Sequence, residues 1–527
     1  MARDGCLARV TAGFAVGGAV GGAVGAVYGT YEAIRFKLYP LVGNLIGFLH
    51  NHHRFHDWVA ELLSTSPSLT IQVNGFLGFS HGICTADPAG LEHLLRSNFS
   101  NYVNATRFQS VLCELLGNGI FNVDGELWVA QRKISSHEFK TKSLKCFISD
   151  AVQSQLATRL IPYLSSACKN QEVVDLQDVL RKFTFDNICN VAFGVDPAWL
   201  DSKNDDQTSL SSSFVRAFDY AVQISSDRLL LPFPIVWKIK RLLNIGSEKH
   251  FKKAIRIIND YALKIILSKE QSCQNKDGME REHYQDLLSR FVHSSSDLEF
   301  HDVDEKRRFL RDIVISFILA GKDSTSTALT WFFWLIAGHP HCERLIYNEL
   351  AAVSPDKFPS IFSYDKLKEL NYLHAALTES LRLFPPIPIN SRLAMSSDTL
   401  NNGTHVRKGW FADYSAYAMG RMERLWGADC REFRPERWLD ENGVFQPCDQ
   451  FKFPVFHCSP RICLGKEMAY VQMKSIAAAM MYEFEVVAVD SGGCPERIVN
   501  PPYTLSLFLK MKGGLLVRLK RREEATA

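Results

Sequence analysis

The sequence predicts a mainly α-helical fold with a small β-sheet region. The first observation is a helical pattern from about Asp304 to Gly338, which contains no proline and which Gly338-His339-Pro340 ends. At 1.5 Å per residue such a helix is about 50 Å long, enough to cross a whole domain. The second observation is Asn401-Asn402-Gly403, a strong hairpin signal whose strands would lie at 389–395 and 411–417. Polar stretches expected to be surface loops between helices lie at 201–213, 272–282 and 294–299.

Length and charge limit the classes of protein to be considered. The chain has 527 residues, far more than one small core needs. Lys plus Arg is 60 and Asp plus Glu is 57, which gives a net charge of +3 and argues against nucleic acid as a partner. The 13 cysteines are scattered, as expected for a reducing compartment without structural disulfides.

The N-terminal segment differs from the rest of the chain. No charge occurs between Arg9 and Glu32, and the segment is rich in Gly, Ala and Val. About twenty such residues are long enough to span a bilayer as a helix. Arg35 and Lys37 follow, where the positive-inside rule expects the cytosolic face. We therefore expect residues 1–38 to be a membrane anchor and linker, with a plastid transit peptide as the alternative, and 39–527 to be one large cytosolic domain.

A loop near the C-terminus, Phe456 to Gly465, carries the most specific chemistry. Cys463 stands just before a helical pattern that begins at Lys466, where the helix dipole favours thiolate. A thiolate is a ligand that soft metal centres prefer. Arg461 supplies a donor suited to a carboxylate, Gly465 allows a flat ligand close to the backbone, and Phe456 can pack on its edge. Haem offers an iron, a flat face and two propionates, and cysteine is a known axial ligand of it.

The loop resembles the haem-binding loop of the cytochrome P-450 superfamily, Phe-x-x-Gly-x-Arg-x-Cys-x-Gly. The resemblance makes Cys463 the axial ligand of the haem iron. Cys458, the second thiol of the loop, is expected to be a packing residue. Ser459 stands where the family has glycine, and we expect it to strain the loop or to shift the hydrogen bonds near the sulfur.

The middle of the long helix resembles the oxygen-binding groove of the same family, Ala/Gly-Gly-x-Asp/Glu-Thr-Thr/Ser. Ala320 and Gly321 are expected to leave room for a flat ligand. The resemblance assigns proton delivery to Asp323, Ser324 and Thr325. Ser324 replaces the usual threonine and lacks the methyl group that fixes the rotamer, so we expect activity with leakier proton delivery.

Two further motifs support the resemblance. Glu379 and Arg382 share a helix face and match the family's Glu-x-x-Arg motif, whose third partner would be Arg437 in the segment 433–438. These three residues are expected to form a structural network behind the haem. The resemblance assigns contacts with the haem propionates to Trp128, Arg132 and Arg392.

The resemblance extends from about Tyr39 to Arg522, and the segments 183–189, 417–421 and 510–514 are similar to the plant fatty-acid ω-hydroxylase clan. It implies the haem-thiolate monooxygenase fold with its long central helix and haem b, iron protoporphyrin IX, as cofactor. It also implies O2, an NADPH-dependent flavoprotein reductase and a place in the endoplasmic reticulum membrane. The expected reaction hydroxylates an alkyl carbon, near the ω end, of a fatty acid or another amphipathic carboxylate.

The substrate and the reaction leave alternatives open. Arg107 is expected to hold a carboxylate at the pocket mouth, and Ile387, Ile389 and Leu505 to line the pocket. The clan also contains hydroxylases of jasmonoyl-amino-acid conjugates. From other classes, a haem-thiolate hydroperoxide isomerase or dehydratase and an inactive haem protein remain, the latter because of Ser459 and Ser324.

Overall fold

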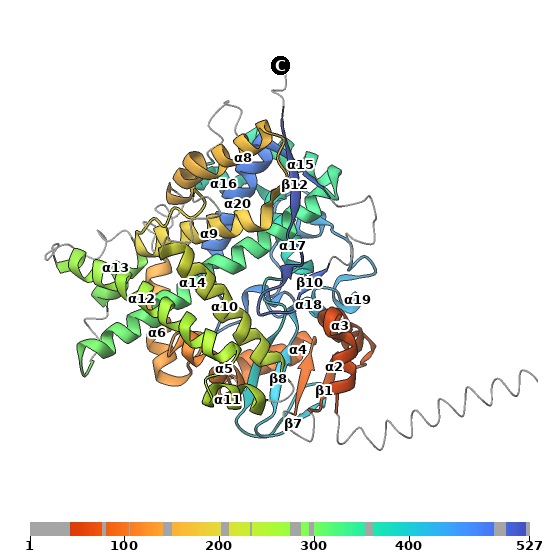
Figure 1. Ribbon diagram of the computed structural model, residues 1–527. Helices are drawn as coiled ribbons and strands as arrows, with labels where there is room; N and C mark the ends of the chain where they lie inside the picture. Colours follow the sequence, from red (N-terminus) through yellow and green to blue (C-terminus); the bar gives the residue numbers. More distant parts are fainter. Residues whose placement is uncertain are drawn as a thin grey trace, which may run out of the picture.

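The computed structural model shown in Figure 1 describes most of the chain. The described residues are 43–75, 81–104, 106–140, 150–201, 210–231, 234–274, 286–294, 300–353, 362–489 and 502–522. The expected anchor, residues 1–38, lies outside them. Within these ranges, no helix combines the length and the apolar composition that a bilayer crossing needs.

The predicted mainly α-helical fold with small sheets is confirmed, and its longest element is α14, Val303–Ala337. The Asp302 carboxylate caps this helix by accepting the Glu305 N–H at 2.6 Å. Three helices packed against α14 are α9 (Leu176–Phe193), α17 (Asn371–Leu383) and α20 (Lys466–Glu483). The long helix therefore runs through the core as the proline-free pattern predicted.

The remaining helices surround this centre, as Figure 1 shows. They are α2 Leu45–Asn51, α3 Phe55–Thr65, α4 Pro88–Glu92, α5 Thr106–Leu116, α6 Gly125–Lys140, α8 Ile161–Lys169, α10 Leu210–Leu230, α11 Pro234–Leu242, α12 Ser247–Gln274, α13 Leu287–Ser294, α15 Pro340–Val353, α16 Tyr364–Glu369, α18 Ala416–Met419 and α19 Glu423–Trp426.

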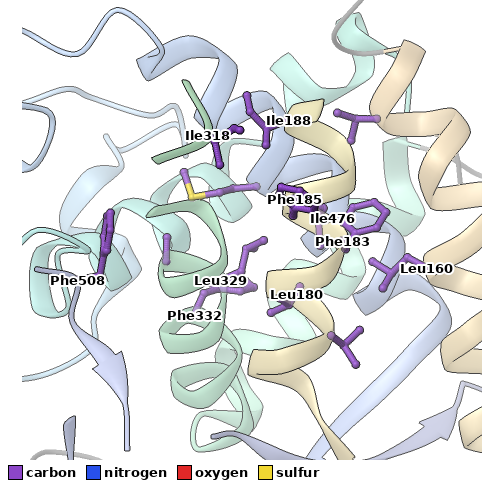
Figure 2. Close-up of a cluster of buried hydrophobic side chains, with 14 of the residues drawn as sticks. Leu160, Leu180, Phe183, Phe185, Ile188, Ile318, Leu329, Phe332, Ile476 and Phe508 are labelled. Atoms are coloured by element: carbon purple, nitrogen blue, oxygen red, sulfur yellow. The ribbon is translucent and has the colours of Figure 1, made fainter. Parts of the chain in front are cut away.

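The main core lies between these helices. Figure 2 shows the apolar side chains of α9, among them Phe183 and Phe185, with Leu329 and Phe332 of α14 nearby. All four are fully buried. The two helices cross closely at Gly321, because a Cβ there would lie 2.5 Å from Ile188 Cγ1. Gly321 thus serves helix packing, and the expectation that it leaves room for a ligand is wrong.

A five-stranded sheet forms the second layer, in the order β1-β2-β8-β5-β3. Its strands are β1 Thr70–Val73, β2 Gly82–Thr85, β3 Tyr102–Asn104, β5 Asn390–Ala394 and β8 Phe411–Tyr414. Only β2 and β8 pair in parallel, and the register sets Arg392 opposite Asn104 and Ala412. The predicted strand pair is therefore confirmed, and the Asn-Asn-Gly turn connects two short strands between its partners, β6 Asp398–Thr399 and β7 His405–Val406.

Two smaller sheets complete the C-terminal part. One has the order β4-β12-β9, with β4 Val174–Asp175, β9 Phe484–Ala488 and β12 Leu516–Arg521. The other is a pair of β10 Tyr503–Thr504 and β11 Lys510–Met511. Trp331 Nε1 on α14 donates to the Leu509 carbonyl at 2.6 Å, so the turn between β10 and β11 is held against the long helix.

His56 on α3 is buried where this helix meets α18 and β10. Its ring lies between those of Tyr417 and Tyr503, with centroids 5.5 and 5.4 Å away. Burial, with the charge of Arg421 as a smaller cause, lowers the pKa of His56 to about 3. The native state therefore binds this proton less readily than the unfolded chain, whose histidine has a pKa of about 6.5.

This difference predicts that acid weakens the fold through His56. Below pH 6.5 the unfolded state binds a proton at His56 that the native state does not bind, so the stability of the fold decreases as the pH falls toward 3. Relative to a His56→Leu variant, the free energy of unfolding of the wild type should fall by up to about 1.4 kcal/mol per pH unit in this window. Urea unfolding midpoints of both proteins at pH 7.5 and 5.5 measure this, and a parallel pH dependence would contradict it.

Candidate active site

The Cys463 loop is closed by its own backbone. The Cys463 N–H donates to the Phe456 carbonyl at 2.8 Å, and α20 begins three residues later at Lys466. Gln450 fixes the middle of the loop, since its side-chain oxygen accepts the Ser459 N–H and its carbonyl accepts the Cys458 thiol, both at 3.1 Å. Cys458 is buried, as a packing residue would be. Of the two thiols in the loop, Cys463 is the exposed one.

The Cys463 side chain is accessible although protein atoms surround it. It is exposed, while desolvation raises the pKa of its thiol; the Gly465 backbone N–H and the charges of Arg132 and Lys466 act in the opposite direction. Accessibility together with desolvation describes a side chain that lines an enclosed space. The N–H at the helix start thus favours thiolate, as expected, but burial has the larger effect on the pKa of the free thiol.

The strain predicted for Ser459 falls on another residue. His457 has φ +58° and ψ −175°, a region that glycine adopts far more easily than histidine, and Ser459 is not among the residues with positive φ. The His457 ring bonds to the Tyr414 hydroxyl at 2.7 Å, which holds the strained residue in place. Burial first, and the charges of Arg392, Arg461 and Arg132 next, lower the pKa of His457 to about 3.

Three arginines gather beside the loop. Arg132 comes from α6, Arg392 from β5 and Arg461 from the loop itself. Burial lowers the pKa of each, and for Arg461 the charges of Arg392 and Arg132 add to this and bring it to about 10. Arg392 Nε is buried and has no hydrogen-bond partner among the described residues. Clustered positive charges with an unused hydrogen-bond donor favour the binding of anionic groups.

Two side chains that the sequence did not single out share this cluster. Asp124, just before α6, accepts from Arg461 Nη2 at 2.6 Å and from the Asn104 backbone N–H at 3.0 Å. Asn104 Oδ1 accepts from Arg392 Nη1. The one sequence signal for Asp124 is its place immediately before a helix start. That place is equally typical of an acid that only caps the helix. Among the described residues, Asp124 is the acid that neutralises part of the arginine charge.

The other expected cofactor residues lie around the same loop. The Arg461 guanidinium lies 4.4 Å from the centroid of the Trp128 ring, and Trp128 is buried on α6, one turn before Arg132. Phe456 is partly buried against Tyr470 of α20, with ring centroids 5.4 Å apart. A Cβ added to Gly465 would lie 3.9 Å from the Cys463 sulfur, so this glycine keeps the surroundings of the thiol open.

The middle of α14 contains the expected proton-delivery residues. Ala320 is exposed although its neighbours Ile318 and Leu319 are buried, so the helix borders an open space there. Ser324, one turn on, donates its hydroxyl to the Ala320 carbonyl. Asp323 and Thr325 are buried, and the charges of Lys322 and Lys510 overcome the effect of burial and hold the pKa of Asp323 well below its usual value.

The structure brings Glu379, Arg382 and Arg437 together. Arg382 donates to both oxygens of Glu379, at 2.7 and 2.6 Å, and both side chains are fully buried. Arg437 Nε lies 3.3 Å from Glu379 Oε1, and Trp438 Nε1 donates to Oε2 at 2.8 Å. The network ties α17 to the segment that leads into the Cys463 loop.

The expected substrate residues are placed less fully. Ile387 and Ile389 are partly buried before β5, and Leu505 is partly buried in the turn between β10 and β11. Arg107 belongs to α5, but its side chain lies outside the described residues.

The site residues fit the haem that the resemblance implies. Arg392 Nε, which lacks a hydrogen-bond partner in the described part of the chain, and the three clustered guanidiniums suit two propionates. The Cys463 thiol suits a soft metal ion. Ala320 is an exposed small residue in the buried middle of a helix, as a flat ring system requires.

Breaking the buried pair predicts a large loss of stability. A Glu379→Gln substitution leaves the fully buried Arg382 charge without its carboxylate, which should cost roughly 3–5 kcal/mol of unfolding free energy. Glu369→Gln, on an exposed residue of α16, is the matched control and should change little. Equal urea midpoints for the two variants would contradict the assigned role of the pair.

Comparison with known proteins identifies the family. The family model for cytochrome P450 matches residues 35–517. A second model, for reactive mitochondrial oxygen species modulator 1, matches only the short segment 5–47, which includes the glycine-rich N-terminus.

Three relatives are similar over nearly their whole length. Cytochrome P450 94A1 of Vicia sativa is 44% identical over 494 residues, which are 92% of this chain and 90% of the relative. Cytochrome P450 94B1 of Arabidopsis thaliana is 41% identical over 492 residues, 92% and 91% of the two chains. Cytochrome P450 86B1 of Arabidopsis thaliana is 36% identical over 514 residues, 94% and 88%. The chain belongs to the cytochrome P450 family and is a haem-dependent monooxygenase.

Proposed function

We propose that this monooxygenase hydroxylates an alkyl carbon near the ω end of a fatty acid. The observation that carries the proposal is the accessible Cys463 thiol just before α20, beside three clustered arginines. The helix α20 packs against α14, which contains the acid and the hydroxyls. The substrate class rests on the similarity of the chain to the plant fatty-acid ω-hydroxylase clan. Electrons would come from an NADPH-dependent flavoprotein reductase.

Each group of site residues would have one task. Cys463 would ligate the haem iron, while Arg132, Arg392, Arg461 and Trp128 would hold the propionates. When bound, haem supplies the activation of O2 and the insertion of one oxygen atom into a C–H bond. The overall reaction takes one O2, two electrons and two protons, and releases the alcohol and one water.

Proton control falls to the chain itself. Asp323 lies on α14 next to Ser324, whose hydroxyl is one turn from the exposed Ala320. The Oδ2 oxygen of Asp323 is buried without a hydrogen-bond partner among the described residues. A carboxylate with one free oxygen can accept a proton and pass it to a nearby hydroxyl. We assign this transfer to Asp323, with Ser324 and Thr325 as the hydroxyls that receive the proton.

The substrate would lie along an apolar wall. Ile387, Ile389 and Leu505 supply partly buried apolar surface, which suits an alkyl chain, and Arg107 on α5 is proposed to hold the carboxylate. A jasmonoyl-amino-acid conjugate has the same combination of a carboxylate and an alkyl end. It therefore remains the second candidate.

Turnover with labelled oxygen tests the reaction and the substrate together. Purified enzyme, plant reductase and NADPH under ¹⁸O2 should convert a saturated fatty acid into an ω-hydroxy acid that carries one labelled oxygen. Preference for a jasmonoyl-isoleucine conjugate would favour the second candidate. Conversion of a fatty-acid hydroperoxide without NADPH or O2 would instead indicate an isomerase or dehydratase, and no product at all would indicate an inactive haem protein.

We further propose that the protein is held at the endoplasmic reticulum membrane by residues 1–38, with the domain in the cytosol. Two apolar surfaces support contact with a membrane. On α2, Ile46 and Leu49 are 61% and 57% exposed, and on α11 and just beyond it, Leu242 and Leu243 are 85% and 59% exposed. Both helices lie in the lower part of Figure 1. Large apolar residues exposed together mark interaction sites.

Vesicle flotation tests the membrane proposal. The full chain should float with phosphatidylcholine vesicles, and a chain lacking residues 1–38 should float less but still measurably. Leu242→Glu in the shortened chain should abolish the remaining flotation, while Leu516→Glu, on an exposed residue of β12, should not. A shortened chain that floats as fully as the intact one would contradict the anchor.

A further inference from the structure

Lys322 is a fully buried lysine that the proposed proton transfer does not use. It lies on α14 between Gly321 and Asp323. Its ammonium donates to Asp219 Oδ1 on α10 at 2.7 Å and to Asp323 Oδ1 at 2.8 Å. Burying an unpaired ammonium costs several kcal/mol, whereas two carboxylates can offset that cost. The lysine thus depends on both acids, which come from different helices.

Further charges extend this contact in both directions. Arg181 Nη1 on α9 lies 2.5 Å from Asp219 Oδ2, and Lys510 Nζ on β11 lies 3.3 Å from Asp323 Oδ1. We call this series, Arg181, Asp219, Lys322, Asp323 and Lys510, the charge bridge. It crosses four elements and passes directly through the acid to which we assign proton transfer.

The charge bridge decides the protonation state of Asp323. Its Oδ1 oxygen faces two ammonium groups, while Oδ2 is buried with no hydrogen-bond partner in the part of the chain that the structure describes. Burial alone would raise the pKa of Asp323, but Lys322 and Lys510 lower it, and Asp219 and Asp323 in turn raise the pKa of Lys322 against its own desolvation. Lys322 therefore carries a proton next to an ionised carboxylate that is placed to receive one.

The bridge also reaches solvent. Asp219 is 23% exposed and Lys510 is 29% exposed, whereas Lys322 and Asp323 are completely enclosed. A proton given by Lys322 Nζ to Asp323 Oδ1 can be replaced through the water-accessible Asp219 carboxylate. Each hop spans a hydrogen bond of 2.7 or 2.8 Å, within the reach that proton transfer needs.

We propose that Lys322, held by Asp219, is a positioning residue that keeps Asp323 ionised, fixes its orientation and connects it to solvent protons. The inference rests on the proton-transfer role proposed for Asp323. Without Lys322, the buried Asp323 would keep, among the described residues, the contact with Lys510 at 3.3 Å and the more remote charge of Arg181. Asp323 would then no longer receive protons from Lys322 during turnover, at pH values at which the wild type is active.

The test compares the variants Lys322→Met and Asp219→Asn with the wild type. The measured quantity is the fraction of NADPH electrons recovered in hydroxylated product, and the hydrogen peroxide released is measured alongside it. Peroxide formation also takes one O2, two electrons and two protons, so each peroxide released replaces one hydroxylation, and electrons recovered in neither product have reduced O2 to water. Both variants should lower the fraction severalfold. The variant carrying both changes should be no worse than Lys322→Met, because the two residues act as a unit.

The pH profile separates positioning from simple structural support. In the wild type, Lys322 and Lys510 contact Asp323, and the charge of Arg181, which contacts Asp219, also acts on Asp323. Removing Lys322 removes one ammonium, so the pKa of Asp323 should rise and the acid limb of the coupling profile should move to higher pH. A purely structural role would lower the urea midpoint and leave the position of that limb unchanged.

Lys269→Met is the matched control, since Lys269 pairs with Asp286 at the same 2.8 Å but on α12. It should lower the urea midpoint without changing the product fraction. Should Lys322→Met fail to fold, Asp219→Asn carries the test. Unchanged coupling in a folded bridge variant, or additive losses in the double variant, would overturn the inference. A wild type that forms no hydroxylated product would instead refute the proposed function.

Discussion

One buried guanidinium, that of Arg382, holds together the part of the molecule that carries the Cys463 loop. Besides its two bonds to Glu379, it donates to the carbonyls of Cys430 and Glu432, at 2.6 and 3.0 Å, and to that of Gly420. A Cβ on Gly420 would lie 2.0 Å from the Arg382 carbonyl, so only glycine lets the chain pass this close. Because a buried charge must keep all its partners, this one side chain fixes how α17 meets the segment from 420 to 438. The loop that follows inherits its position from that contact.

The arginines beside the loop impose a second constraint, of opposite character. Arg382 is satisfied by protein groups, whereas Arg132, Arg392 and Arg461 crowd together with Asp124 as their acid among the described residues. Mutual repulsion and burial both act against this arrangement. An anionic ligand relieves both, and a ligand that binds only the native state stabilises it. With the propionates on these arginines, as proposed, haem binding would stabilise this region.

Local patterns allowed most of the fold and part of the site to be predicted. The long helix, the Asn-Asn-Gly hairpin and the start of α20 depend on residues close in sequence, so their signals are local. The charge bridge could not be predicted, because Asp219 and Lys322 are 103 residues apart in sequence and meet only in the folded chain. The same reason explains Gly321, whose neighbour Ile188 comes from another helix. A charged residue inside an apolar helical run was the one signal that Lys322 offered.

The central claim is that Cys463 ligates the haem iron, and the carbon monoxide difference spectrum of the reduced protein tests it most directly. The wild type and a Cys458→Ser variant should both show the strongly red-shifted band of thiolate-ligated haem, since Cys458 is a buried packing residue. Cys463→Ser should lose this band. A band that persists in Cys463→Ser, or one that disappears in Cys458→Ser while haem remains bound, would contradict the account.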